Sequence, residues 1–175
     1  DTYINYVNMA DYLFPLSILD IGCSIGISTE YLYHHYDVEH MYGLDLSPYF
    51  IGVAQERTNV HNKPIKYIHG NAECLPFDDN SIQMITFNFI FHELPELASY
   101  NILQEAYRVL EPNGIIVLVD IDKSHLDETL KNNVFRRWAF EATEPHIYDY
   151  YKRDNELSIK NVGYKNVIKI KNDPL

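Results

Sequence analysis

Residues 18–29 read Ile-Leu-Asp-Ile-Gly-Cys-Ser-Ile-Gly-Ile-Ser-Thr, and this stretch decides the fold because it joins a buried strand to a helix. Three of its first four residues are apolar and two are β-branched, which is typical of a strand covered on both faces in a parallel sheet. Gly22 and Gly26 let the backbone turn sharply and approach a ligand closely. The helix that follows, capped by Ser28 or Thr29, directs its unpaired N–H groups and positive dipole end toward the turn. This geometry is typical of a site for an anion or a nucleotide.

The composition is that of an ordinary globular protein. The chain has 175 residues, a formal net charge of −11, 46% hydrophobic residues and 22% charged residues. A chain of this length is expected to form one domain that buries roughly two-thirds of the surface of its unfolded form. The negative charge argues against a nucleic-acid binder, which needs clustered Lys and Arg for phosphate contacts. We expect a single domain with no nucleic-acid partner.

Apolar runs and cysteines narrow the class of protein further. The longest apolar runs, such as 115–119, are too short to span a bilayer, so no transmembrane segment is expected. Cys23 and Cys74 match neither a disulfide framework nor a zinc pattern, and no metal site is predicted. A reducing compartment is expected, either the cytoplasm or an organelle reached after removal of a targeting segment.

Apolar segments of strand and helix type alternate along the chain. Strands are expected over 18–21, 41–46, 65–69, 82–89, 115–120 and 164–171. Helices are expected over 1–17, 30–36, 49–57, 97–110, 126–140 and 155–162, with an aromatic-rich loop over 141–151. The strand over 115–120 is apolar throughout, which favours a central position, and Ser47 is expected to cap the helix that begins near Pro48. Such alternation predicts an α/β fold with a doubly wound, mostly parallel sheet.

Ligands of doubly wound sheets bind at the carboxyl ends of the strands. That rule selects the segments 22–26, 45–47, 71–73, 88–93 and 120–124. Asp45 ends the second strand, where a carboxylate can accept both hydroxyls of a ribose. Asn71 and Glu73 can hydrogen-bond an adenine edge, while Leu46 and Ala72 contact its faces. These residues favour a nucleoside ligand, and a helix cap is the alternative role of Asp45.

Two nucleotide classes then remain, dinucleotides and S-adenosylmethionine. The dinucleotide fingerprint G-x-G-x-x-G is absent, because only Gly22 and Gly26 are present and Ser24 stands between them. Five stretches follow in order: LDIGCSIG at 19–26, GLDLS at 43–47, GNAE at 70–73, LPFDDNSI at 75–82 and LQEAYRVLEPNG at 103–114. Together they resemble the class I S-adenosylmethionine-dependent methyltransferases, especially the small-molecule branch with quinone- and tocopherol-type ring methyltransferases.

The resemblance implies a Rossmann-like methyltransferase fold that binds S-adenosylmethionine. The expected division of the chain is the N-terminal helix over 1–17, a cofactor-binding core over 18–122 and substrate-side helices with the last strand over 123–175. The cofactor-binding residues that it implies, from the methionine end to the ribose, the adenine and the sulfonium, are Asp20, Gly22, Cys23, Ser24, Gly26, Asp45, Leu46, Asn71, Ala72, Glu73, Asn88 and Phe89. Two of these depart from the family pattern, since Ser24 replaces a glycine and Asn71 an aspartate.

The predicted reaction is displacement of the methyl group from a sulfonium, driven by alignment and exclusion of water. A general base is needed only if the acceptor must lose a proton. His92 and Glu93 follow the fourth strand, and His146 lies in the aromatic-rich loop, so these three are the catalytic candidates. A lone His near a strand end is also common as a structural residue.

We therefore expect a methyltransferase that acts on a small molecule of aromatic or lipid-like character. The alternatives are a non-catalytic methyltransferase-like scaffold and an NAD-dependent oxidoreductase. A nucleic-acid methyltransferase is disfavoured, because Asn88-Phe89-Ile90-Phe91 stands where base-modifying enzymes carry an N-P-P-Y-type motif.

The end of the sequence leads to one more expectation. The family that the chain resembles closes its sheet with a final antiparallel strand, but little sequence follows the predicted strand at 164–171. We expect this final strand to be missing and the chain to be a piece of a longer protein. An edge left open in this way would favour pairing with another chain.

Overall fold

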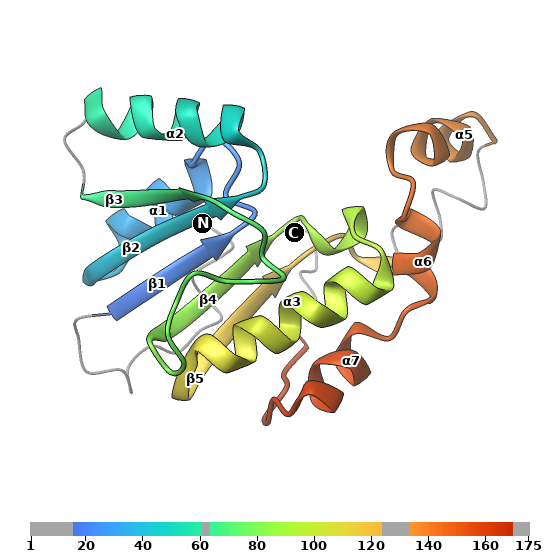
Figure 1. Cartoon of the computed structure of the whole chain (residues 1–175). Helices are drawn as coiled ribbons and strands as arrows, with labels where there is room; N and C mark the ends of the chain where they lie inside the picture. Colours follow the sequence, from blue (N-terminus) through green and yellow to red (C-terminus); the bar gives the residue numbers. More distant parts are fainter. Residues whose placement is uncertain (1–15, 61–63, 124–133, 170–175) are drawn as a thin grey trace.

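The fold is built on five strands whose order across the sheet is β3-β2-β1-β4-β5, with parallel pairing at every junction. The computed structural model describes residues 16–60, 64–123 and 134–169. The strands are β1 (Leu16–Ile21), β2 (Val38–Asp45), β3 (Ile65–His69), β4 (Ile82–Asn88) and β5 (Leu110–Val119). The order reverses beside β1, so the carboxyl ends of β1, β2 and β4 meet at the switch point of a doubly wound sheet (Figure 1).

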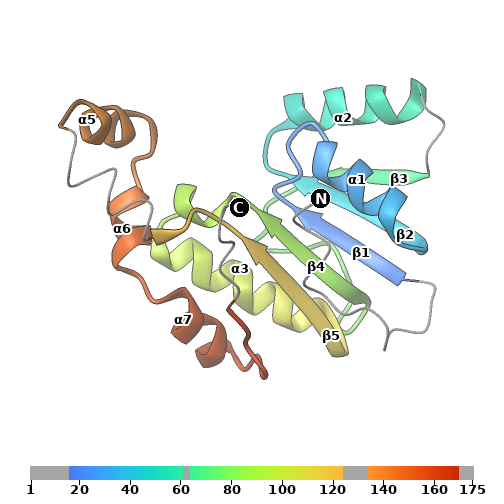
Figure 2. The same cartoon turned by 180° about the vertical axis from the view of Figure 1, so that it is seen from behind.

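Helices cover both faces of the sheet. They are α1 (Ile27–His35), α2 (Pro48–Val60), the short 3₁₀ helix η2 (Phe91–Glu93), α3 (Glu96–Val109), α5 (Val134–Thr143), α6 (Ile147–Lys152) and α7 (Asn155–Val162). In Figure 1, α3 lies in front of the β4–β5 half with α7 beside it, and α1 lies behind β1 and β2; Figure 2 shows the reverse view. The sheet is therefore the middle of three layers.

Two apolar clusters hold these layers together. On one face, Leu19, Ile21 and Phe87 of the sheet pack with α3, α6 and η2. On the other face, alternate residues of the same strands, such as Ile18, pack with α1 and α2 around Ala54. Because successive side chains of a strand point to opposite faces, a short apolar run such as β1 supplies both clusters.

Several predicted elements agree with the structure to within a residue or two. The strand over 65–69 and the helix over 155–162 are found with the predicted bounds. Gly163 ends α7 with φ = 123°, a conformation that favours glycine. The Ser47 hydroxyl accepts a hydrogen bond from the Phe50 N–H at 3.4 Å, so the predicted cap of α2 is confirmed.

The structure corrects the position of β5 and the start of the chain. Among the described residues β5 is an edge strand and not a central one, and its residues from Ile115 onward are only half buried. An apolar run of this kind is typical of a strand in a parallel sheet and carries no information about strand order. Leu16 and Ser17 belong to β1 rather than to a helix, and residues 1–15 of the predicted N-terminal helix lie outside the described residues.

Three further corrections concern the second half of the chain and α1. The predicted loop over 141–151 is largely helical, because α5 continues to Thr143 and α6 buries Ile147 in the core. Residues 164–169 form no strand; Tyr164 instead packs edge-on against Tyr107. Residues 170–171 of that strand, and 126–133 of the predicted helix, lie outside the described residues. Finally, Gly26 occupies the cap position of α1, with no side-chain cap.

Within the described parts of the chain, every helix is too short or too polar to cross a bilayer.

Candidate functional site

The turn between β1 and α1 has an unusual backbone. Gly22, Ser24 and Gly26 have φ angles of 75°, 49° and 82°, all in the left-handed region. A Cβ on Gly26 would lie 2.3 Å from the Tyr67 hydroxyl, and one on Gly22 would lie 2.3 Å from the Ile90 side chain. The two glycines are therefore required by close packing against neighbouring side chains as well as by the turn.

Asp20 lies beneath this turn and is fully buried. One carboxylate oxygen accepts from the hydroxyls of Ser28 at 2.6 Å and Thr29 at 2.8 Å. The other accepts from the Thr86 hydroxyl at 2.7 Å and the Asn88 amide at 3.0 Å. Burial raises the pKa of Asp20, and these four hydrogen bonds act in the opposite direction. The carboxylate thus ties the first turn of α1 to the end of β4, which is why Ser28 and Thr29 do not cap α1.

Asp45 lies at the end of β2 and is bound to the turn through the backbone. One carboxylate oxygen accepts from the Ser24 N–H at 2.8 Å, and the other from the Ser47 N–H at 2.8 Å. A carboxylate oxygen can accept a second hydrogen bond, so both oxygens can still receive ribose hydroxyls. The ribose-binding role of Asp45 remains a prediction that this geometry allows.

The predicted adenine side follows β3. The Asn71 side-chain oxygen accepts from the Glu73 N–H at 2.9 Å, which closes a tight turn. The Glu73 carboxylate accepts from the Asn101 amide at 2.7 Å. Leu46 is 69% exposed beside these residues, while Ala72 packs against the core. Asn71 and Glu73 thus already have partners, and their contact with adenine stays a prediction.

A cavity of about 450 Å³ opens beside the glycine turn. Its lining brings together five of the predicted cofactor residues, which are Gly22, Cys23, Ser24, Asn88 and Phe89. Apolar side chains of α1, β4 and β5 complete the wall, among them Tyr31, Met84 and Val117. Asp45 and residues 71–73 are not part of this lining.

Phe89, after β4, has a strained backbone conformation. Its φ of 56° is uncommon for a bulky side chain, and its N–H donates to the Val119 carbonyl at 2.8 Å. The ring is 49% exposed although Phe is normally buried. Strained backbone of this kind clusters at ligand sites, so the position supports the predicted contact of Phe89 with a ligand.

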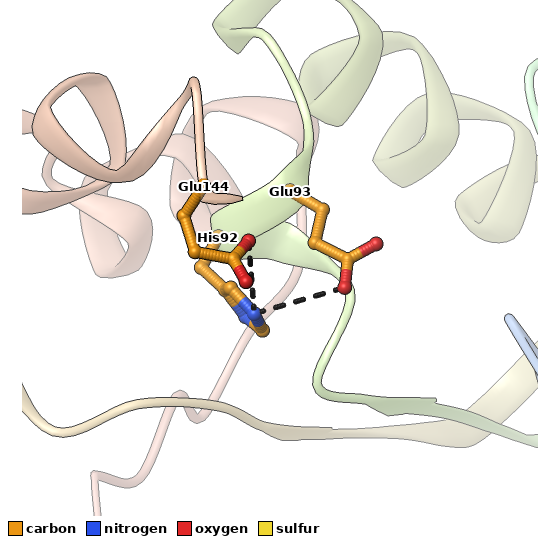
Figure 3. Close-up of side chains that lie close together, drawn as sticks. All are labelled: His92, Glu93 and Glu144. Carbon is orange, nitrogen blue, oxygen red and sulfur yellow. Dashed lines mark ion pairs between the residues drawn. The ribbon is translucent and has the colours of Figure 1, made fainter. Parts of the chain in front are cut away.

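His92 lies in η2 and is held by Asp120 at the end of β5. The His92 Nδ1 and an Asp120 carboxylate oxygen are 2.6 Å apart, and the other oxygen accepts from the Phe91 N–H at 2.8 Å. The remaining ring nitrogen, Nε2, lies 3.9 Å from a carboxylate oxygen of Glu93 and 3.9 Å from one of Glu144 (Figure 3). The hydrogen bond to Asp120 raises the pKa of His92; burial opposes this, and the neighbouring carboxylates add to it.

The catalytic candidates are thus only partly brought together. His92 and Glu93 share one cluster, while His146 precedes α6 and is not a member of it. Sequence reasoning missed Glu144, which has no local signal. It did select the segment that begins at Asp120, because that residue follows a strand, but it did not assign Asp120 a role.

Arg153, at the end of α6, fixes the position of η2. Its guanidinium donates to the carbonyls of Phe91 at 3.2 Å and Leu94 at 3.1 Å, and to the Ser99 hydroxyl. It also lines a second cavity of about 420 Å³ on the α3–α7 face of the sheet. The backbone that carries His92 is therefore attached to two separate parts of the chain.

Comparison with known proteins points to one family. A family model described as "Methyltransferase domain" matches residues 19–118. A demethylmenaquinone methyltransferase of Listeria welshimeri is 32% identical over 114 residues, which are 63% of this chain and 47% of that protein. The chain thus spans about half the length of this relative.

Solved structures show the same fold. The PH0226 protein from Pyrococcus horikoshii OT3 has a TM-score of 0.60 and 23% identity, over 69% of this chain and 57% of that one. Phosphoethanolamine N-methyltransferase 1 of Haemonchus contortus, solved with phosphoethanolamine and S-adenosylhomocysteine, has a TM-score of 0.54 and 27% identity, over 62% of this chain and 23% of that one.

Proposed function

We propose that this chain, which belongs to the methyltransferase domain family, transfers a methyl group from S-adenosylmethionine to a small-molecule acceptor. The observation that carries the proposal is the cavity beside the glycine turn. It joins Gly22, Ser24, Asn88 and Phe89, and Asp45 is bound to the same turn at Ser24.

The residues at this site fit the cofactor. S-adenosylmethionine supplies a methyl group on a positively charged sulfonium. Asp45 can accept the ribose hydroxyls with the lone pairs that Ser24 and Ser47 leave, and exposed Leu46 can cover an adenine face. Asp20 lies beneath the glycine turn and supports the site indirectly, because its four hydrogen bonds hold the start of α1 and Asn88 in place.

The acceptor side lies beyond β4, at η2. Phe89 directly follows β4, and His92 and Glu93 lie in the short helix η2 after it. Because the substrate of a doubly wound sheet meets its cofactor at the strand ends, we place the acceptor beside these residues. Asp120 orients the His92 ring so that Nε2 faces outward from this buried pair.

We further propose that the acceptor is an aromatic ring of the quinone type. The relative from Listeria welshimeri is named for methylation of demethylmenaquinone. Tyr150 of α6 is buried in the core and packs edge-on to His92, and Tyr148 of the same helix is partly buried beside that core. Aromatic side chains of this kind suit a planar apolar ring.

Calorimetry with S-adenosylhomocysteine and NAD tests the cofactor assignment. We expect S-adenosylhomocysteine, the product of methyl transfer, to bind. NAD should bind at least about tenfold more weakly, a difference of about 1.4 kcal/mol in binding free energy. Equal or tighter binding of NAD would overturn the proposal in favour of an oxidoreductase. Methyl transfer to demethylmenaquinol analogues then tests the activity, and cofactor binding without turnover on any ring acceptor would favour a non-catalytic scaffold.

Variants on the acceptor side separate catalysis from cofactor binding. His92→Asn and Glu93→Gln should lower turnover while leaving the affinity for S-adenosylhomocysteine within a few-fold, because both side chains lie outside the cofactor cavity. His34→Asn, an exposed histidine of α1, is the matched control. A parallel loss of turnover and affinity would contradict the placement of the acceptor.

A further inference from the structure

We propose that His92, Glu93 and Glu144 bind a divalent metal cation, with Asp120 as the residue that positions His92. The sequence pattern of cysteines predicts no metal site, and Glu144 is far from the other two residues along the chain. Folding brings the three together, with one ligand atom from each lying within 4.8 Å of the others.

The distances are close to those of a coordinated ion. Nε2 of His92 lies 3.9 Å from Glu93 and 3.9 Å from Glu144. Ligands about 2.1 Å from one metal ion are roughly 3–3.4 Å apart in octahedral or tetrahedral sites. For the two pairs that include Nε2 the gap is less than about 1 Å. The Glu93 and Glu144 oxygens lie within 4.8 Å of each other, so their gap is at most about 1.8 Å, and Glu side chains can close both gaps by rotamer adjustment. Figure 3 shows the two carboxylates approaching the same ring nitrogen from separate segments of the chain.

The histidine of this cluster already has a fixed ring orientation. The His92 side chain is 9% exposed and Asp120 is 2% exposed, so the pair is shielded from water. With the Nδ1 proton donated to Asp120 at 2.6 Å, the Nε2 lone pair is directed at the two glutamates. A carboxylate behind a metal-binding histidine is the usual outer partner, which sets the tautomer and the ring orientation. Asp120 is itself fixed by the backbone N–H groups of Phe91 and Ile121.

Charge also favours a cation. Three carboxylates, Glu93, Glu144 and Asp120, surround one imidazole. Like charges this close together repel one another. A divalent ion would relieve this repulsion, since one imidazole and two carboxylates suit ions such as Mn²⁺ or Zn²⁺.

The position of the site gives the ion a use that rests on the proposed function. It lies beside η2, where we place the acceptor, and a three-ligand site leaves positions open for an oxygen of the acceptor ring. The ion would bind that oxygen and orient the ring. Cation binding itself does not depend on methyl transfer, so the two proposals can be tested separately.

Calorimetric titration of the whole chain with Mn²⁺, and separately with Zn²⁺, tests the site. We expect saturable binding of one equivalent and a rise in melting temperature with added cation, because binding to the native state stabilises it. Glu144→Gln should lower the affinity at least about tenfold, and Asp120→Asn by about 10–100-fold, as for outer-shell partners. Glu56→Gln, an exposed residue of α2, should bind the cation like the unaltered chain.

Two results would overturn the proposal. One is the lack of saturable binding of either ion at cation concentrations up to about 1 mM, which corresponds to a binding free energy of only about 4 kcal/mol. The other is unchanged cation binding by the Glu144→Gln variant. The Glu144 side chain is partly exposed, so it can be replaced without unfolding the chain, and circular dichroism of the variant checks the fold. S-adenosylhomocysteine is titrated into the same samples. Cofactor binding without cation binding defeats only the metal site, whereas cation binding without cofactor binding defeats only the proposed function.

Discussion

Replacing Asp20 by Ala should destabilise the fold by about 3–5 kcal/mol, the range for removing one partner from a buried charged network. The substitution leaves two buried donors, Thr29 and Thr86, and two half-buried donors, Ser28 and Asn88, without their acceptor. Each buried donor costs about 1–3 kcal/mol if nothing replaces the acceptor. The sum is reduced because hydroxyls can turn to other acceptors and because the cost of burying the carboxylate disappears. Urea unfolding should report this loss of free energy. Thermal unfolding should show a fall of about 6–20 °C in melting temperature for a chain of this length.

A second substitution makes this test specific for the network. Thr86→Val nearly conserves side-chain volume and removes one donor to Asp20, so it should cost about 1–2 kcal/mol in the unaltered chain. In the Asp20→Ala background the Thr86 hydroxyl has lost this acceptor, and the same change should cost close to nothing. The control Asp37→Ala, an exposed carboxylate, should stay within about 0.5 kcal/mol. The reasoning is refuted if Asp20→Ala costs less than about 1 kcal/mol or if the two substitutions are additive within about 0.5 kcal/mol.

Three other predictions follow from single contacts. Asp45→Ala should weaken S-adenosylhomocysteine binding by about 1.5–3 kcal/mol in calorimetry; unchanged affinity with an intact fold would remove Asp45 from the cofactor site. The hydrogen bond from Arg108 lowers the pKa of Glu105 from its ordinary 4.5, so this pair stabilises the fold fully above that pH and less as pH falls through the lowered pKa. Urea melts at several pH values should therefore show a deficit for Glu105→Gln that shrinks in acid, and a deficit independent of pH would contradict the pairing. Tyr164→Phe should cost about 1 kcal/mol in unfolding free energy, because its hydroxyl donates to the Leu103 carbonyl at 3.2 Å, and no loss would mean that this segment does not pack on α3.

Much of the fold was predictable because its signals are local. The glycine turn, the strand over 65–69 and the helix over 155–162 each depend on residues a few positions apart, such as Gly163 at the end of α7. The expectation of parallel strands alternating with helices was confirmed for the same reason. Strand order is different, since β5 is apolar whether it lies at the centre or the edge of the sheet.

On the acceptor side, the sequence predicted only some of the residues that the structure brings together. His92 and Glu93 were predicted from their place after β4, and both lie in the cluster that the structure reveals. His146 was predicted from its aromatic neighbours and lies outside that cluster, because helical residues 147–152 replace the expected loop. Glu144 had no pattern of its own to mark it.

The sequence by itself determined the family, the α/β fold and the strand ends at which a ligand is expected, because periodicity, glycines and helix caps act within a turn or a strand of the chain. Only the tertiary structure decided how side chains meet across the sheet. Asp20 lies 66 residues before Thr86, and His92 lies 28 residues before Asp120, yet both pairs are in hydrogen-bond contact. Such contacts depend on strand register and on the angles at which helices pack, and no short stretch of sequence contains either.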